Sequence, residues 1–202
     1  MAETFVYYKE GSNKDIPVVL LHGTGGTESD LTTIADFLFP DSPQIGIRGR
    51  LLENGYTRYF THDENGGFDL KSLDVETNWL MDEIASQITS RNLKTERAVI
   101  IGYSNGANIA INAWLKGRNP IKNGVLFHPM LIEENPMDVS LSNLNLWMSF
   151  GTQDSFVSSD NFDRLLVELS GAKIKVFRNE QPHAISEAEL LSAQSWAIDL
   201  LK

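Results

Sequence analysis

The sequence predicts an α/β fold, in which a mostly parallel sheet is covered by helices on both faces. Apolar runs and helix-like stretches alternate along the chain, and the runs at 17–21 and 98–101 are apolar throughout, as is typical of central parallel strands. A glycine-rich turn follows each of these runs directly, at 22–27 and 102–106. We expect the 202 residues to form a single domain, 1–202.

The first half of the chain contains four predicted elements and a long irregular segment. We expect two strands joined as a hairpin at 5–8 and 17–21, a helix at 31–39 and a third strand at 44–49. Residues 49–69 have no sustained period and are rich in glycine, asparagine, aspartate and aromatic residues. We interpret them as a long loop that forms part of a substrate wall, although its aromatic side chains could equally form a small separate core.

Helices and strands alternate through the second half of the chain. The predicted elements are helix 72–91, strand 98–101, helix 107–115, strands 124–127 and 146–150, helix 160–169, outer strand 173–178 and a last helix that opens with a capping box at Ser186 and Glu189. The stretch between residues 129 and 146 is too short for an inserted helical domain. We therefore expect no large cap domain and a comparatively open cleft.

The composition narrows the range of partners. The formal net charge of −10 opposes broad attraction to nucleic acid or to anionic lipid, so we expect no nucleic acid partner and no stable membrane association. The first residues lack the basic and apolar pattern of a secretory signal, which favours a cytoplasmic location. The absence of cysteine excludes disulfides, a thiol nucleophile and thiolate metal sites. The sequence leaves a homodimer open.

The turn Gly102-Tyr103-Ser104-Asn105-Gly106 has the pattern of a nucleophile elbow. It lies between an apolar strand and a helix, where the backbone at the serine is strained and the flanking glycines avoid collisions with neighbouring backbone. Such a turn holds the serine hydroxyl out from the edge of the sheet. The alternative is a glycine- and serine-containing helix start without chemistry.

A second glycine-rich turn, His22-Gly23-Thr24-Gly25-Gly26, follows the strand at 17–21. Backbone N–H groups in such a turn can converge on an anion, so we expect the backbone of Thr24, together with that of Asn105, to form an oxyanion hole. A plain glycine turn is the alternative. We expect His22 to brace this loop and not to act as a base.

Asp154 and His183 complete the order serine, acid, histidine that this architecture requires. Asp154 follows the strand at 146–150 directly, whereas Asp160 and Asp163 fall on a predicted helix. Among the possible bases, His62 and His128 precede the acid, and only His183 follows it. The alternatives are an aspartate that braces its own turn and a surface histidine before a helix.

Five residues near the predicted cleft are candidate substrate contacts: Gly25, Arg58, Phe60, His62 and Phe68. Arg58 lies in the same part of the chain as Arg48 and Arg50. These arginines could hold a carboxylate or a phenolate, or they could brace the loop or remain solvated, as most charged residues do.

Together, the glycine turn after residue 21, the serine elbow, the Gly151-x-x-Asp154 turn and His183 resemble the phospholipase/carboxylesterase family of α/β-hydrolases, and within it the bacterial carboxylesterases of the MhqD type. The resemblance covers essentially the whole chain. It implies an α/β-hydrolase fold and hydrolysis of carboxylic esters through an acyl-enzyme, without a metal or organic cofactor. The related acyl-protein thioesterases usually carry Ser-Gln-Gly-Gly at the elbow, and the difference disfavours protein depalmitoylation.

We therefore expect a serine carboxylesterase that acts on a small-molecule ester with a small or medium acyl group. The same machinery would accept the carbonyl of a thioester or a lysophospholipid, so a thioesterase or lysophospholipase is the alternative enzyme. A hydrolase fold that has lost its chemistry and serves as a ligand receptor is the alternative outside enzymes.

Overall fold

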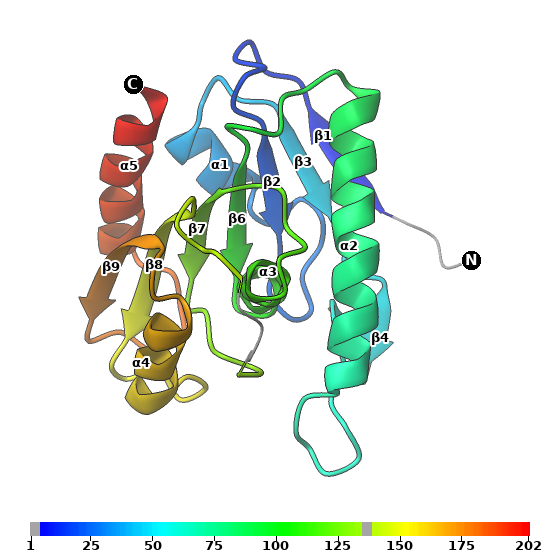
Figure 1. Ribbon diagram of the computed structural model, residues 1–202, viewed down its shortest axis with the longest axis vertical. Coiled ribbons are helices and arrows are strands. Elements are labelled where there is room, and N and C mark those ends of the chain that lie inside the picture. Colours follow the sequence, from blue (N-terminus) through cyan, green and yellow to red (C-terminus); the bar gives the residue numbers. More distant parts are fainter. Residues whose placement is uncertain (1–4, 135–138) are drawn as a thin grey trace.

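The computed structural model describes residues 5–134 and 139–202, and its centre is a seven-stranded sheet in the order β1-β3-β2-β6-β7-β8-β9 (Figure 1). The strands are Val6–Lys9 (β1), Val18–Leu21 (β2), Gln44–Ile47 (β3), Val99–Tyr103 (β6), Asn123–Phe127 (β7), Asn145–Gly151 (β8) and Lys173–Asn179 (β9). Only β1 runs antiparallel to its neighbour. The mostly parallel sheet predicted from the sequence is confirmed.

Helices cover both faces of this sheet, as expected. They are Thr32–Leu38 (α1), Leu70–Ser90 (α2), Asn105–Leu115 (α3), Ser159–Glu168 (α4) and Glu187–Leu201 (α5). In Figure 1, α1 and α5 lie on one side of the sheet, and α2, α3 and α4 lie on the other. Each side has its own hydrophobic core, one containing Leu80 of α2 and Phe162 of α4 and the other containing Ala35 of α1 and Trp196 of α5.

The predicted hairpin between the first two strands is wrong. β1 pairs with β3, with Val6 opposite Ile47, while β2 lies between β3 and β6. The reason is burial: all four residues of β2 are buried, so β2 needs a strand on each side, whereas β1 is only partly buried and suits the edge of the sheet.

The segment 49–69 is more ordered than the predicted loop. It contains a two-stranded hairpin of Leu51–Glu53 (β4) and Tyr56–Arg58 (β5), followed by a bridge between His62 and Phe68. Asn54 and Gly55 turn the hairpin with φ of 50° and 82°. An Asn-Gly pair is the characteristic sequence of such a tight turn, so this hairpin could have been predicted from the sequence.

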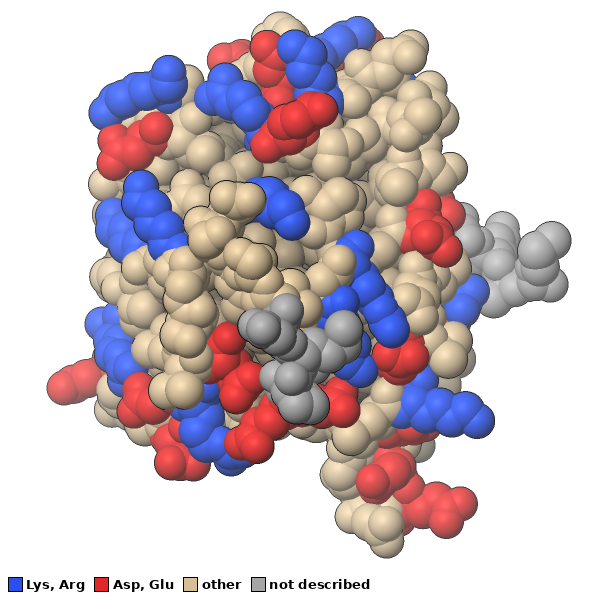
Figure 2. All heavy atoms as spheres, in the orientation of Figure 1, with Lys and Arg blue, Asp and Glu red and all other residues tan. Residues whose placement is uncertain are grey.

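The described part of the connection between β7 and β8, residues 128–134 and 139–144, contains no helix. This agrees with the expected absence of a large cap, although residues 135–138 of that stretch lie outside the described residues. No helix in the described residues is both long enough and apolar enough to cross a membrane. On the face drawn in Figure 2, acidic and basic side chains are interspersed.

Gly106 is a sensitive point of this fold, because a Cβ there would lie 2.2 Å from the carbonyl oxygen of Leu21 in β2. We expect Gly106→Ala to lower the free energy of unfolding by about 3 kcal/mol, since neither backbone can move aside cheaply. Urea unfolding measures the change. Gly67→Ala is the control: its Cβ would meet only the side chain of the exposed Asp63. Equal stability of the two variants would contradict the close packing of α3 against β2.

Candidate active site

Ser104 stands at a sharp turn between β6, which ends at Tyr103, and α3, which begins at Asn105. Its backbone has φ 50° and ψ −113°, a strained conformation for a residue with a side chain. Glycine is required on either side. A Cβ at Gly102 would lie 2.9 Å from the Cα of Ala107, and Gly106 meets the backbone of β2 as described above.

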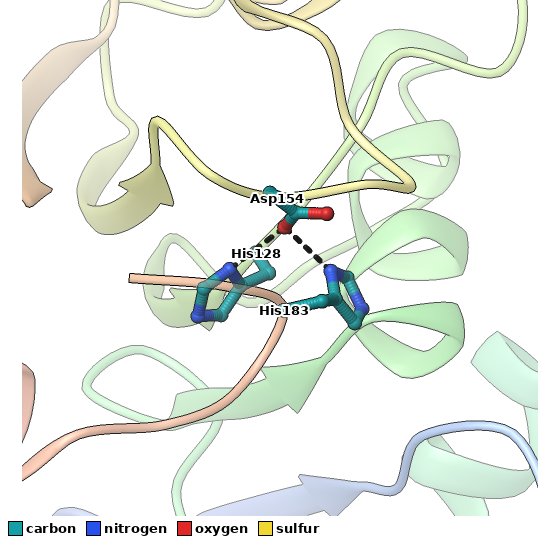
Figure 3. Close-up of side chains that lie close together, drawn as sticks. All are labelled: His128, Asp154 and His183. Atoms are coloured by element: carbon teal, nitrogen blue, oxygen red, sulfur yellow. Dashed lines mark hydrogen bonds and ion pairs between the residues drawn. The ribbon is translucent and has the colours of Figure 1, made fainter. Parts of the chain in front are cut away.

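The structure brings Ser104, Asp154 and His183 into one hydrogen-bonded chain. His183 Nε2 lies 2.8 Å from Ser104 Oγ. On the other side of the ring, His183 Nδ1 lies 2.6 Å from Asp154 Oδ2 (Figure 3). The carboxylate accepts a hydrogen bond from Nδ1–H, which leaves the Nε2 lone pair free to accept the serine proton.

Two loops meet closely to make this contact. Asp154 follows β8, and His183 lies between β9 and α5. A Cβ on Gly151, at the end of β8, would lie 2.1 Å from the carbonyl oxygen of Gln181. Glycine at 151 therefore allows the histidine loop to lie directly against the aspartate loop.

Burial and hydrogen bonding oppose each other at the Asp154 carboxyl. Burial disfavours its charge, but His183 and the N–H groups of Phe156 and Val157 all donate to it, and together they hold the pKa of Asp154 below its ordinary value. Burial lowers the pKa of His183, and the nearby Asp154 only partly offsets this effect. The resting site therefore contains a carboxylate and a neutral imidazole near neutral pH.

Thr24 and Asn105 line the same cavity as Ser104. Within residues 5–134 and 139–202, neither backbone N–H has a hydrogen-bond acceptor. For Asn105 this follows from its position as the first residue of α3, because the first N–H groups of a helix have no partner within it. Both N–H groups are therefore free to donate a hydrogen bond into the cavity.

The cavity over Ser104 has a volume of about 320 Å³. Its lining residues come from six separate segments: Thr24, Arg58, His62, Phe68, Tyr103, Ser104, Asn105, Asn108, His128, Met130, Phe156 and His183. Arg58, His62 and Phe68 therefore lie where the substrate contacts were expected.

Two other candidate contacts lie elsewhere. Phe60 is fully buried and packs edge to face against Phe68, with ring centroids 5.5 Å apart, so it supports the cavity wall from behind. Gly25 lines a neighbouring hollow together with Gly23 and Leu31. The sequence alone could not show which of Phe60 and Phe68 lines the cavity, because the bridge between residues 62 and 68 decides which ring faces it.

The arginines near this wall have different partners. Arg48 pairs with Glu28, and Arg50 forms two hydrogen bonds with Glu76, so both brace the structure. Arg58 Nε donates to the Phe60 carbonyl and lies 3.4 Å from Glu53, whose carboxylate also accepts from His62 at 2.7 Å. A polar cluster of Glu53, Arg58 and His62 therefore forms one side of the cavity.

His22 braces its loop, as expected. It is buried, its Nδ1 donates to the Gly23 carbonyl at 2.6 Å, and its Nε2 accepts from the Gly49 N–H at 2.9 Å. Burial lowers the pKa of His22 and favours the neutral ring, while the Gly49 N–H fixes the tautomer by requiring an acceptor at Nε2. The ring joins the loop of Thr24 to the segment that follows β3.

Sequence reasoning missed Tyr103 and His128, which contact His183 and Asp154, and Glu189, which contacts His128. Tyr103 donates its hydroxyl to the His183 carbonyl at 3.0 Å. His128, fully buried at the end of β7, lies 3.0 Å from Asp154 Oδ2 (Figure 3). Glu189 forms the predicted capping box of α5, but its second oxygen lies 3.1 Å from His128 Nε2. Chain order excluded His128 as the base and gave no sign of this contact.

The asparagines of the elbow helix hold neighbouring segments in place. Asn105 Oδ1 accepts from the N–H of Tyr59, which follows the β4–β5 hairpin, and Asn108 Oδ1 accepts from the N–H of Met130, which follows β7. One turn further on, Asn112 donates to Thr77 of α2. The spacing of three or four residues places all three on adjacent turns of α3.

A mostly parallel sheet with a serine elbow, an aspartate and a histidine at its carboxyl edge defines the class of α/β-hydrolases. The family model for the dienelactone hydrolase family matches residues 67–186, and the chain belongs to that family. MhqD of Bacillus subtilis strain 168 is 32% identical over 191 residues, which cover 94% of this chain and 95% of MhqD. The resemblance to MhqD-type proteins is confirmed.

Solved structures agree with this assignment. The structure of YahD with malic acid is 34% identical, with a TM-score of 0.93 over 98% of this chain and 100% of YahD. A Bacillus cereus carboxylesterase is 29% identical, with a TM-score of 0.93 over 98% of this chain and 95% of that one. Family and neighbours together identify the chain as a hydrolase of the esterase type.

Asn108 offers a test of how the elbow helix holds the cavity wall. Asn108→Ala leaves the N–H of Met130 without its acceptor, so we expect the free energy of unfolding to fall by about 1 to 2 kcal/mol. Thermal or urea unfolding measures this. Asn65→Ala, at an exposed loop position whose side chain makes no hydrogen bond within the described residues, should change stability by less than about 0.5 kcal/mol. An equally small effect at Asn108 would show that the contact is dispensable.

Proposed function

We propose that this protein is a serine carboxylesterase that hydrolyses small or medium acyl esters through an acyl-enzyme intermediate. One observation carries the proposal: the hydrogen-bonded chain Ser104–His183–Asp154 opens onto a cavity that also receives two unpaired backbone N–H groups. An ester carbonyl placed over Ser104 would meet a nucleophile, a base and oxyanion donors together.

In the first half of the reaction, Ser104 Oγ attacks the ester carbonyl carbon as its proton passes to His183 Nε2. The carbonyl oxygen becomes an oxyanion, which accepts hydrogen bonds from the backbone of Thr24 and Asn105; each such donor commonly contributes about 3 kcal/mol. Asp154 stabilises the imidazolium that has formed. The intermediate collapses, the carbon–oxygen bond to the alcohol breaks, and His183 gives its proton to the leaving alkoxide.

In the second half, water replaces the alcohol. His183 removes a proton from the water as it attacks the acyl carbon, the second tetrahedral intermediate collapses, and Ser104 Oγ leaves with the proton returned by His183. Every proton is carried by a side chain or by water, so the proposed cycle requires neither a metal nor an organic cofactor.

The cavity wall supports a preference for compact esters. Its volume of about 320 Å³ is near the lower end of ligand sites, which run from about 300 to 1,000 Å³. Phe68 offers an apolar surface, while Arg58 and His62 offer polar contacts on the same side. We propose these three residues as the substrate contacts and Phe156, which is 72% exposed, as the rim of the entrance.

Replacement of the nucleophile tests the proposal directly. We expect Ser104→Ala to lower kcat for p-nitrophenyl acetate or butyrate by at least about 10⁴-fold and to leave the fold intact. Ser170→Ala, at an exposed position after α4, is the matched control and should retain full turnover. A fluorophosphonate probe should label the wild type and not the Ser104 variant. A folded wild-type protein that neither turns over esters nor takes the label would point to a receptor instead.

The proposed base gives the reaction a defined pH dependence. His183 must be neutral to accept a proton, and burial holds its pKa below the ordinary value. We therefore expect kcat/KM to stay on its plateau at neutral pH and to fall in acid with a midpoint below about 6.5. Initial rates across a pH series measure this midpoint. A midpoint above the ordinary histidine value would exclude His183 as the base in this environment.

A further inference from the structure

His128 lies at the floor of the site, behind the aspartate. Its side chain and that of Asp154 are fully buried, and its backbone has φ 51° at the end of β7. Figure 3 shows the rings of His128 and His183 on either side of Asp154, each joined to the same carboxylate oxygen. The centroids of the two rings are 5.0 Å apart.

Both ring nitrogens of His128 face hydrogen-bond acceptors. Nδ1 lies 3.0 Å from Asp154 Oδ2, while Nε2 lies 3.1 Å from the Ala184 carbonyl oxygen and 3.1 Å from Glu189 Oε1. A neutral imidazole carries one N–H and leaves its other nitrogen with a lone pair directed at an acceptor. Only the imidazolium form satisfies both sides of the ring.

Glu189 is the second carboxylate beside His128, after Asp154, and its position is fixed by other contacts. Its Oε2 accepts from the N–H and the hydroxyl of Ser186, at 2.7 Å each, within the capping box of α5. This leaves Oε1 facing His128, where it forms an ion pair with Nε2 at 3.1 Å. Among the described residues, Oε1 has no partner in hydrogen-bond geometry. The first turn of α5 therefore places the Glu189 carboxylate beside the buried ring of His128.

From this geometry we propose that His128 is an imidazolium cation at neutral pH, placed between Glu189 and Asp154, and that it acts as a positioning residue which limits the basicity of His183. The proposal rests on the proposed function of His183 as the base. His128 touches neither the serine hydroxyl nor the proposed oxyanion donors, and acts through the shared Asp154 carboxylate.

The surrounding charges support this role. The titratable groups that face His128 are Asp154 after β8, Glu189 on α5, His183 on the adjoining loop and Tyr103 on β6, whose ring centroid lies 6.2 Å away. Burial opposes the charge on His128, but Glu189 and Asp154 together raise its pKa above the ordinary value. The His128 charge in turn lowers the pKa of His183.

The cation affects catalysis through the Asp154 carboxylate. With it, Asp154 stays ionised but shares its Oδ2 between two rings, which reduces the support it gives to the His183 imidazolium. The base can therefore stay neutral, and active, in weakly acidic solution.

Nitrogen NMR of the histidine rings tests the charge without relying on activity. The chain has four histidines, so the His128 signals can be assigned by their loss in His128→Gln. We expect both His128 nitrogens to remain protonated at neutral pH, above the ordinary histidine pKa of about 6.5. A neutral tautomer near neutral pH would overturn the proposal, whatever the protein hydrolyses.

In Glu189→Gln, we expect the pKa of His128 to fall by at least about one pH unit. An unchanged titration would contradict the ion pair between Glu189 and His128.

The pH profile of kcat/KM tests the effect on the base. We expect His128→Gln to move the acid midpoint upward by about one pH unit and to change KM by less than about twofold, since removal of a nearby positive charge favours protonation of His183. Glu187→Gln, at an exposed position on the same first turn of α5, is the control and should leave the midpoint unchanged. An unshifted midpoint in a folded, active His128→Gln protein would refute the coupling. If that variant does not fold, the NMR of the wild type and of Glu189→Gln decides the matter.

Discussion

The parallel pairing of β6, β7 and β8 is the constraint on which the site depends. With Tyr103 opposite Phe127 and Leu126 opposite Met148, the three strands end at one edge of the sheet. Ser104 and His128 are the next residues after β6 and β7, and Asp154 follows β8 by a short turn. Ser104, His128 and Asp154 are far apart in the chain, yet they come together at this edge without a long loop.

A second constraint is charge balance in a buried volume. Glu189, His128 and Asp154 are charged side chains with almost no exposure, and each is stable there only because the others are present. Backbone N–H groups and the hydroxyl of Ser186 satisfy the remaining carboxylate oxygens. The buried network connects the first turn of α5 to Ser104 through the loop that carries His183.

The family assignment and the local structure of the elbow fit together. The match to MhqD and to YahD covers nearly the whole chain at about one third identity, so it includes both the strands of the sheet and the serine elbow. The side chains of Asn105 and Asn108 are engaged by the segments after the β4–β5 hairpin and after β7. These asparagine side chains therefore shape the cavity wall, while the backbone N–H of Asn105 remains available to the cavity.

The sequence by itself determined the sheet class, most helices and the order Ser104, Asp154, His183, because these depend on local periodicity, on glycines that clear close backbone contacts and on chain order. It did not determine that β1 pairs with β3, that Phe60 lies behind Phe68, or that His128 and Glu189 meet behind Asp154. Those contacts join segments that no local pattern relates. Only the packing of distant strands and loops decides which side chains share a buried space, and therefore which carry charge there.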